Sequence, residues 1–266
     1  MADAVRHHRL ALSRADSLTM RMRAAALLCL ALLGATTAHA AGVPADCRQL
    51  LVATAPSWGS QTGTLQRYER DAVGSAWRTV GTPIPVLFGR EGLAWGRGVE
   101  GQNEAGAKKA ERDRRVPAGI FAIGKIYTSD AALPAGADYP FQQVTDADAW
   151  PDDPANPSYN RHLVFPDAAT RPAWFQKQKM KPHDPVYRWL IEIRHNSDPI
   201  VAGAGSAIFF HTRRGETKPS SGCTTMRGAD LLTMVRWLRA ASKPHYAVMP
   251  GMEYTARQAA WGLPAR

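Results

Sequence analysis

Two side chains in the last quarter of the chain have the chemistry for covalent catalysis, a histidine and a cysteine. His211 ends the apolar run 207–210, and Cys223 follows twelve positions later, at the end of Ser-Ser-Gly-Cys. A cysteine attacks as its thiolate, so it needs a base or a positive environment. A histidine accepts the thiol proton and later returns it to a leaving amine. The pair therefore predicts an acyl-transfer site at the end of a strand.

The residues next to Cys223 fit the same chemistry. Gly222 permits a sharp turn and a close approach of substrate, and backbone N–H groups around Cys223 would then face a developing oxyanion. A metal site is the alternative, with His183 or His195 as a third zinc ligand beside His211 and Cys223. Their spacing matches no familiar zinc pattern. The sequence predicts neither a metal nor a cofactor.

Cys47 is the only other cysteine beyond residue 40. The local sequence of Cys223 favours one reactive thiol and one incidental thiol. The alternative is a Cys47–Cys223 disulfide, which an oxidising compartment would permit.

Short strands and turns are expected to position the site. Alternating or apolar runs predict strands at 50–52, 64–69, 77–80 and 85–88. A turn and a strand follow at 116–124, and the later strands are 187–194 and 207–211. Helical spacing at 229–241 predicts the main helix. The fold class is therefore mostly β with a few helices (α+β), in one domain.

Two segments lack such patterns. Residues 97–115 are rich in glycine and then in charge, which predicts an exposed loop with a solvated charge run. Residues 128–185 hold many prolines, and a loop of this length is usually functional or an insertion. Its aromatic residues either line a groove or form a small local core, and the second interpretation is favoured. They are Trp150, Tyr159, Phe165, Trp174 and Phe175.

The N-terminus has the pattern of a secretory signal peptide. Arg21 and Arg23 precede the apolar run 24–33, and Ala-His-Ala ends at residue 40. Cleavage after Ala40 is expected, which leaves 41–266 as the catalytic domain and predicts no stable membrane insertion. A retained anchor is the alternative. Residues 1–19 look like an upstream extension, with translation starting at Met20 or Met22.

The charge indicates which partners to expect. The formal net charge is +10, and loss of residues 1–40 removes five Lys/Arg and two Asp/Glu, which leaves +7. An exported basic protein is drawn to polyanions of the cell-wall space or to anionic headgroups, although a generally basic proteome explains the charge equally well. No nucleic-acid motif is present, and the oligomeric state is not indicated.

Several stretches together resemble one protein family. Phe210-His211, then Ser220-Ser221-Gly222-Cys223 and Met226, resemble the catalytic signature of the YkuD-type L,D-transpeptidases. Further stretches resemble the branch that lacks a separate wall-binding module, and the likeness runs from about residue 50 to 238. These stretches are 89–96, 115–121, 152–154 with 159–160, and 205–211.

The resemblance implies a β-sandwich or barrel-like catalytic domain that acts on peptidoglycan stem peptides. It implies that Cys223 forms a thioacyl intermediate with His211 as base and acid, releases the terminal D-alanine and forms 3–3 cross-links with an amine. Gly222 and Cys223 would supply oxyanion N–H groups, and a carbonyl near Ser221 or Gly222 would orient His211. Ser220 takes the Ser/Thr position of the motif. The implied roles are cell-wall organisation and cell shape, in the periplasm or cell-wall space.

The chain departs from the family pattern beside the nucleophile. Ser221 stands where the family has His, and Thr225 stands where it usually has Arg. The substrate-contacting candidates are therefore Arg213, Thr224 and Thr225, with Arg214 and Arg227 as substitutes for the missing arginine. Two other functions are consistent with these residues: an L,D-carboxypeptidase or hydrolase of the same stem peptides, and a non-catalytic peptidoglycan-binding protein.

Overall fold

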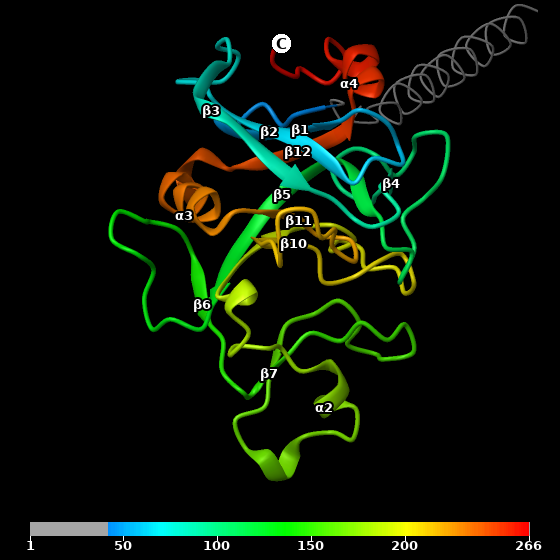
Figure 1. Ribbon diagram of the computed structural model, residues 1–266, viewed down its shortest axis with the longest axis vertical. Helices are drawn as coiled ribbons and strands as arrows, with labels where there is room; N and C mark the ends of the chain where they lie inside the picture. The colour runs from blue at the N-terminus through cyan, green and yellow to red at the C-terminus, as the bar shows by residue number, and fades with distance from the viewer. Residues whose placement is uncertain (1–41, 266) are drawn as a thin grey trace, which may run out of the picture. The chain divides into compact units, whose positions relative to one another are not determined.

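Eight strands close into a barrel in this computed structural model, which describes residues 42–265 (Figure 1). The order around the barrel is β12, β1, β2, β3, β11, β10, β9 and β5, and β5 pairs again with β12. The bounds are β1 Gln49–Ala55, β2 Thr62–Glu69, β3 Arg78–Leu87, β5 Val116–Thr128, β9 Trp189–Ile193, β10 Phe209–Thr212, β11 Thr224–Met226 and β12 His245–Pro250. The mostly β fold with few helices confirms the predicted fold class.

The barrel is mixed. β1 pairs with β12 in parallel and β10 pairs with β11 in parallel, whereas the other neighbours around the barrel are antiparallel. β4 (Leu93–Trp95) and β6 (Phe141–Gln143) pair with β5 outside the ring. The strands predicted at 77–80 and 85–88 are two parts of one strand, β3. Its pairing with β2 shifts register between Leu65 and Arg67 of β2, and Gly81 of β3 has φ of +65° in this irregular part.

On β10 and β11, the residues whose side chains point into the barrel show which adjacent residues of the same strand point outward. On β10, Phe210 is fully buried and its ring packs edge-on against Tyr246, with 4.6 Å between the ring centroids. On β11, the Thr224 hydroxyl lies 3.0 Å from the Tyr246 hydroxyl. Successive side chains of a strand point to opposite faces. His211, next to Phe210, therefore projects from the outer face of the barrel.

Three helices accompany the barrel in the described residues: α2 (Phe175–Gln178), α3 (Gly228–Trp237) and α4 (Gly251–Arg257). The α3 helix buries Leu231, Met234 and Val235 in the main core. The helix predicted at 229–241 ends earlier than expected, because the backbone becomes extended at the buried Leu238. The 3₁₀ turn η3 (Ala240–Ser242) follows it.

The segment 129–188 lies outside the barrel wall and carries little regular structure, as predicted (Figure 1, lower half). Besides β6 and α2 it contains β7 (Asp148–Ala149), β8 (Leu163–Val164), η1 (Ala168–Thr170) and η2 (Pro185–Tyr187). Its buried residues join barrel residues in a second hydrophobic cluster, against which Cys223 packs. The cluster contains Tyr127, Val144, Met180, Leu190 and Phe209.

The aromatic residues of this segment divide between the two expected roles. Phe165 packs against Trp174 and Phe175, with ring centroids 5.7 and 5.6 Å apart, as a local core does. Trp150 instead lines the main pocket and stacks edge-on against Phe209. Both interpretations are therefore correct, each for a different part of the segment.

No helix among residues 42–265 combines the length and the apolar character that a membrane span requires. The predicted signal peptide at 1–40, its upstream extension 1–19 and the start sites Met20 and Met22 lie outside the described residues.

Candidate active site

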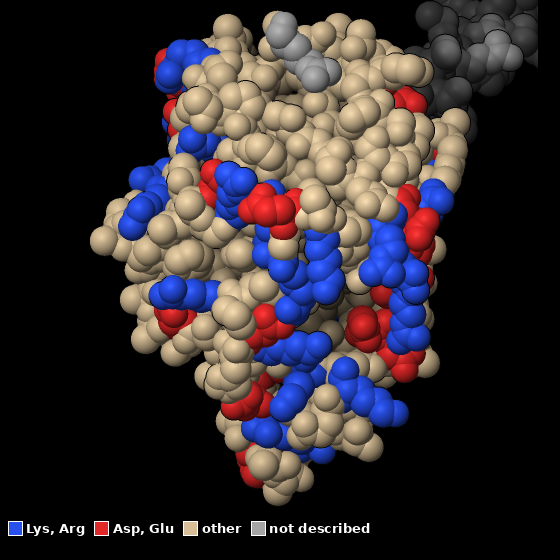
Figure 2. Space-filling view, in the orientation of Figure 1, with Lys and Arg blue, Asp and Glu red and all other residues tan. Residues whose placement is uncertain are grey.

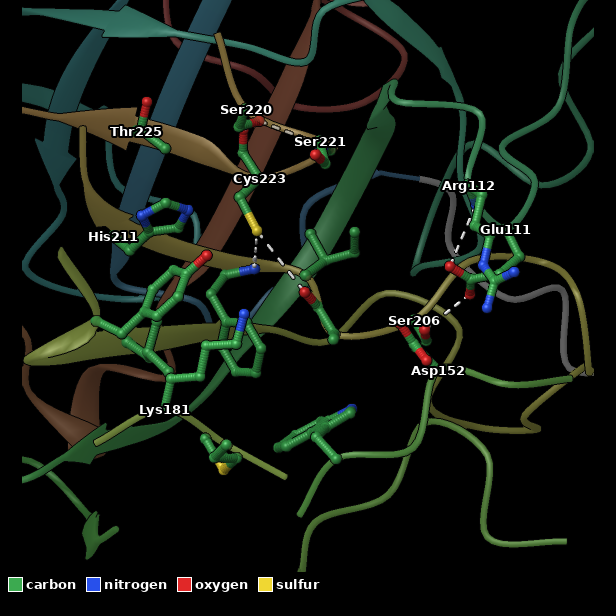
Figure 3. A pocket seen from close by; sticks show the side chains of 18 of the residues that line it. Glu111, Arg112, Asp152, Lys181, Ser206, His211, Ser220, Ser221, Cys223 and Thr225 are labelled. Carbon is green, nitrogen blue, oxygen red and sulfur yellow. Dashed lines mark hydrogen bonds between the residues drawn. The ribbon is translucent and has the colours of Figure 1, made fainter. Parts of the chain in front are cut away.

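The parallel pair β10–β11 brings the predicted nucleophile and base to one place. His211 lies opposite Thr225 in the register, and Cys223 directly precedes β11. The backbone N–H of Phe209, two residues before His211, donates to the Cys223 sulfur at 3.4 Å. Both side chains line the same pocket (Figure 3). The structure therefore assembles His211 and Cys223 from positions twelve residues apart.

The turn before Cys223 is held by Ser220. The Ser220 hydroxyl donates to the Cys223 carbonyl at 2.5 Å and accepts from the Gly222 N–H at 3.0 Å. Gly222 has φ of +145°, and a Cβ added there would lie 3.1 Å from the Arg115 carbonyl oxygen. Glycine therefore suits this turn on both conformational and steric grounds. The expected oxyanion role of Gly222 needs correction, because its N–H already donates to Ser220.

The ring of His211 has one nitrogen fixed and the other available. Nδ1 lies 2.8 Å from the Thr212 carbonyl oxygen, so Nδ1 carries the proton and donates it. Nε2 is then the unprotonated nitrogen, as a general base requires. The expectation that Ser221 or Gly222 would orient this ring is wrong, since the carbonyl of Thr212 does so. Tyr187 packs edge-on against the ring, with centroids 5.0 Å apart.

The resting thiol is directed to a backbone carbonyl. The Cys223 sulfur donates to the Ala207 carbonyl oxygen at 3.7 Å, whereas no hydrogen bond joins it to the His211 ring in the described part of the chain. Ala207 is itself fixed, because its N–H donates to the Asn160 side chain. Asn160 also accepts from Trp150 Nε1, which links this backbone to the pocket wall.

Burial keeps both predicted catalytic groups uncharged. It raises the pKa of the Cys223 thiol to about 11, although the Phe209 N–H and the Lys109 cation oppose the rise. It lowers the pKa of His211 to about 4, against the hydrogen bond to Thr212, which favours the charged ring. At neutral pH the pair is therefore a thiol and a neutral imidazole. A nucleophilic role for Cys223 would therefore require deprotonation of the thiol during its attack on a carbonyl.

The pocket is a cleft of about 570 Å³ between the β10–β11 edge and the segment 150–187. Apolar and aromatic side chains, among them Trp150, Met180 and Phe209, form part of its wall. Eight Lys and Arg line it, compared with two acidic residues, Glu111 and Asp152. Figure 2 shows Lys and Arg gathered around a hollow on this face. The site is therefore concave and strongly basic.

The three predicted substrate-contacting residues separate in the structure. Thr225 lines the pocket. Thr224 does not, because its fully buried hydroxyl contacts Tyr246 inside the barrel. Arg213 is not among the pocket-lining residues either, since its guanidinium pairs with Glu216. The expectation for Thr224 and Arg213 is therefore corrected.

The two substitutes proposed for the missing arginine also differ. Arg214 lines the pocket and pairs with Asp184, while Arg227 shares the Glu216 carboxylate with Arg213. Ser221, which stands where the family has His, is exposed on the pocket wall. Only Arg214 therefore provides a guanidinium at the pocket from this set.

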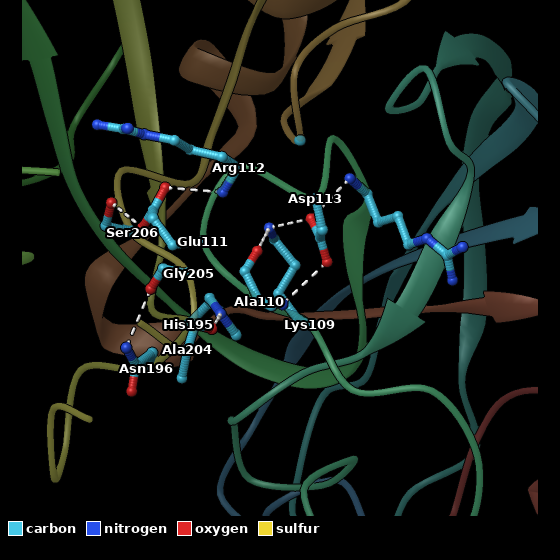
Figure 4. A network of polar contacts seen from close by, with 12 residues as sticks. Lys109, Ala110, Glu111, Arg112, Asp113, His195, Asn196, Ala204, Gly205 and Ser206 are labelled. Carbon is cyan, nitrogen blue, oxygen red and sulfur yellow. Dashed lines mark hydrogen bonds and ion pairs between the residues drawn. The ribbon is translucent and has the colours of Figure 1, made fainter. Parts of the chain in front are cut away.

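Part of the charged run at 108–115 is buried rather than solvated (Figure 4). The Lys109 side chain is 3% exposed and pairs with Asp113, whose carboxylate also accepts from the Arg115 N–H at 2.9 Å. Glu111 accepts from the hydroxyls of Tyr159 and Ser206. The expectation of a solvated run fails here because intramolecular donors and acceptors compensate the buried charges.

Sequence reasoning did not single out Lys109, Glu111 or Ser206. For Lys109 and Glu111 the only local signal was the density of charge in Lys109-Ala-Glu111-Arg-Asp113. The chain turns at Glu111 and Arg112, where Arg112 has φ of +61°, so strand-like alternation does not tell which of these side chains are buried. Nothing in the sequence indicated that Glu111 would face Tyr159, which lies 48 residues away.

Cys47 and His195, the alternative disulfide and metal-binding candidates, form hydrogen bonds to backbone groups away from Cys223. Cys47 and Cys223 are both free thiols, and Cys47 is fully buried with its sulfur donating to the Gln49 carbonyl at 3.2 Å. The alternative of a Cys47–Cys223 disulfide is therefore not supported. His195 accepts from the Arg97 N–H and donates to the Ala204 carbonyl. Among residues 42–265, no three His, Cys, Asp or Glu side chains are grouped as a metal ion would require.

The comparisons agree with this geometry. The family model described as the YkuD L,D-transpeptidase catalytic domain matches residues 65–248, which is more than half of the chain and extends from β2 into β12. No curated protein and no solved structure matches the chain. On the family match, this chain belongs to the YkuD family of L,D-transpeptidase catalytic domains.

Proposed function

We propose that the protein is a cysteine L,D-transpeptidase of peptidoglycan stem peptides. One observation carries this proposal: His211 and Cys223 project from the outer face of two parallel strands into one pocket, with Nε2 of His211 available as a base. We also propose that residues 41–266, which form one compact unit, are the catalytic domain.

The reaction follows from these positions. The Cys223 sulfur attacks the carbonyl of the third stem residue, and His211 Nε2 takes the thiol proton as the carbon–sulfur bond forms. The oxyanion that develops is assigned to the Cys223 N–H, since the Gly222 N–H is used by Ser220. His211 then returns the proton to the nitrogen of the departing D-alanine. A thioester remains on Cys223.

An amine from a neighbouring stem resolves the thioester. The amine attacks the acyl carbon, His211 accepts one amine proton, and the sulfur leaves as the thiol. The product is a 3–3 cross-link. If water takes the place of the amine, the same residues yield a shortened stem peptide, which is the L,D-carboxypeptidase alternative.

Incubation with purified tetrapeptide muropeptides, followed by mass analysis, tests the proposal. Cross-linked dimers and a transient thioester adduct on Cys223 are expected, and Cys223→Ala should abolish both. The matched control is Cys47→Ala, which removes a buried thiol away from the pocket. Tripeptide products without dimers would assign the hydrolase. Binding to sacculi without turnover in the unaltered protein would assign the non-catalytic alternative.

We further propose that the chain is exported and acts in the periplasm or cell-wall space. The support is the pattern of Arg21, Arg23, the apolar run and Ala-His-Ala. N-terminal sequencing of the protein from the cell envelope should give a chain that begins at Ala41. A chain that keeps residues 24–40 would contradict this cleavage.

A further inference from the structure

Six cations at the mouth of the pocket have no acidic partner. Of the eight Lys and Arg that line it, Lys109 pairs with Asp113 and Arg214 pairs with Asp184. No ion pair in the described part of the chain involves the other six, and all six are exposed. They are Arg90, Arg112, Lys177, Lys179, Lys181 and Lys218.

Nearby acids do not neutralise this group. Asp146 is close enough to Lys179 for an electrostatic interaction, but its carboxylate is hydrogen-bonded to His183. Asp184 is likewise near Lys181, but its carboxylate forms an ion pair with Arg214. Inside the pocket, the Glu111 carboxylate already accepts two hydroxyl groups. Asp152 is the remaining acid of the wall. The mouth therefore has a large excess of positive charge.

The arrangement around the mouth distinguishes these cations from ordinary surface charge. They come from four separate stretches of the chain, near residues 90, 112, 177–181 and 218, and all of them line the one pocket. The hollow around which Lys and Arg gather on this face is visible in Figure 2. Like charges around a concave, partly apolar wall repel one another and concentrate anions. A bound anion removes this repulsion.

We propose that this mouth selects acyl donors by their free carboxylates and discriminates against donors in which a carboxylate is amidated. The inference rests on the proposed transpeptidase function and adds the chemical class of donor. An amide has the shape of a carboxylate but no charge, so its hydrogen bond to an ammonium group is about half as strong as that of the carboxylate. A peptide with several carboxylates matches several cations at once.

The pocket favours a peptide over an anionic polymer as the occupant. The cations line the same pocket as Cys223, Trp150 and Met180, so a ligand that they hold lies beside the thiol and beside apolar side chains. Lys177, Lys179 and Lys181 line the pocket with exposed side chains, and the buried Met180 between them anchors the segment in the second core. Wall-polymer binding is an outcome that the experiment distinguishes.

The test compares two tetrapeptide muropeptide donors that differ only in one carboxylate or its primary amide. For the unaltered protein, kcat/KM should be about tenfold higher with the free carboxylate, because charge-assisted contacts are about twice as strong as neutral ones. In the variant Lys177→Gln/Lys179→Gln/Lys181→Gln, kcat/KM for the carboxylate donor should fall while kcat/KM for the amide donor changes little, so most of the preference disappears. The ratio should also shrink as salt is raised to 0.5 M.

Binding to Cys223→Ala separates this inference from the proposed function. Calorimetry should give the same carboxylate preference whether or not the unaltered protein turns the donors over. The matched control is Lys125→Gln/Arg161→Gln/Lys243→Gln, which removes equal charge outside the pocket and should keep the ratio.

Three outcomes overturn the inference. The first is equal kcat/KM and equal affinity for the two donors. The second is a pocket variant whose kcat/KM falls by the same factor for both donors. The third is a pocket variant that loses binding to sacculi while its preference between the isolated donors is unchanged, which would assign the cations to a wall polymer.

Discussion

The uncharged state of Cys223 and His211 makes a quantitative prediction for thiol reactivity. With a pKa of about 11, Cys223 is thiolate to about one part in ten thousand at pH 7. A free cysteine, with a pKa of about 8.5, is about 3% thiolate at that pH. The more basic thiolate is intrinsically about ten times more nucleophilic, given a Brønsted coefficient near 0.4–0.5. Alkylation of Cys223 should therefore be about 20- to 30-fold slower than that of a cysteine peptide.

Iodoacetamide is the suitable reagent, because it carries no charge and is not concentrated by the basic pocket. The modification of Cys223 would be followed by peptide mass mapping between pH 6 and 9, where its rate should rise about tenfold per pH unit. The mapping separates Cys223 from Cys47, whose pKa burial raises to about 12. His211→Gln should leave this profile nearly unchanged while it abolishes turnover, since the resting thiol donates to Ala207 and not to the ring.

A rate that is independent of pH between 5 and 8 would refute this reasoning. Such a profile belongs to a preformed thiolate–imidazolium pair, in which the thiol pKa lies far below neutrality. The general-base role of His211 would then have to be replaced by that of a general acid.

Three further predictions concern the scaffold of the site. Burial lowers the pKa of His195 to about 3, compared with about 6.5 in the unfolded chain, so its contribution to the unfolding free energy is complete above pH 6.5 and falls by about 1.4 kcal/mol per pH unit below that. Urea unfolding at a series of pH values from 7 to 4 should therefore show that the unfolding free energy of His195→Gln decreases less steeply with falling pH, by this amount per unit below pH 6.5. Tyr159→Phe removes a hydroxyl that donates to the half-buried Glu111 and should lower the unfolding free energy by about 1 kcal/mol, and unchanged urea unfolding would contradict the hydrogen-bond network. Gly222→Ala should reduce kcat at least tenfold with an unchanged circular dichroism spectrum, because its Cβ would crowd the Arg115 carbonyl, and full activity would show that the turn is not constrained.

The sequence indicates a candidate nucleophile, a candidate base and most of the barrel strands because their signals are local, whereas β11 and β12 were not predicted. Alternation and apolar runs identified the strands that became β1, β2, β5 and β9. His211 and Cys223 stand out because few residue types support nucleophilic acyl transfer. The family resemblance rested on contiguous stretches, which one sequence displays in full.

The contacts that fail to follow from the sequence depend on distant parts of the chain. Thr224 lies beside the nucleophile in the sequence, but the alternation of β11 turns it into the barrel against Tyr246. Arg213 precedes Arg214 by one position, and that single step separates a residue paired with Glu216 from one that lines the pocket. Which neighbour faces the substrate depends on strand register, and register is set by pairing partners far along the chain.

The segment 129–188 contributes no strand to the closed ring, yet Lys177, Lys179 and Lys181 stand on it. The acyl-transfer pair, in contrast, stands on the ring itself. If the proposed function and donor selection hold, mutational drift in the segment would alter which stem peptides are accepted without displacing sulfur or imidazole. A lineage that changed its wall chemistry, for example by amidating its stems, would then keep the enzyme in use by replacing a few lysines. For protein engineering, the same separation makes residues 177–181 the place to randomise when a different donor is wanted.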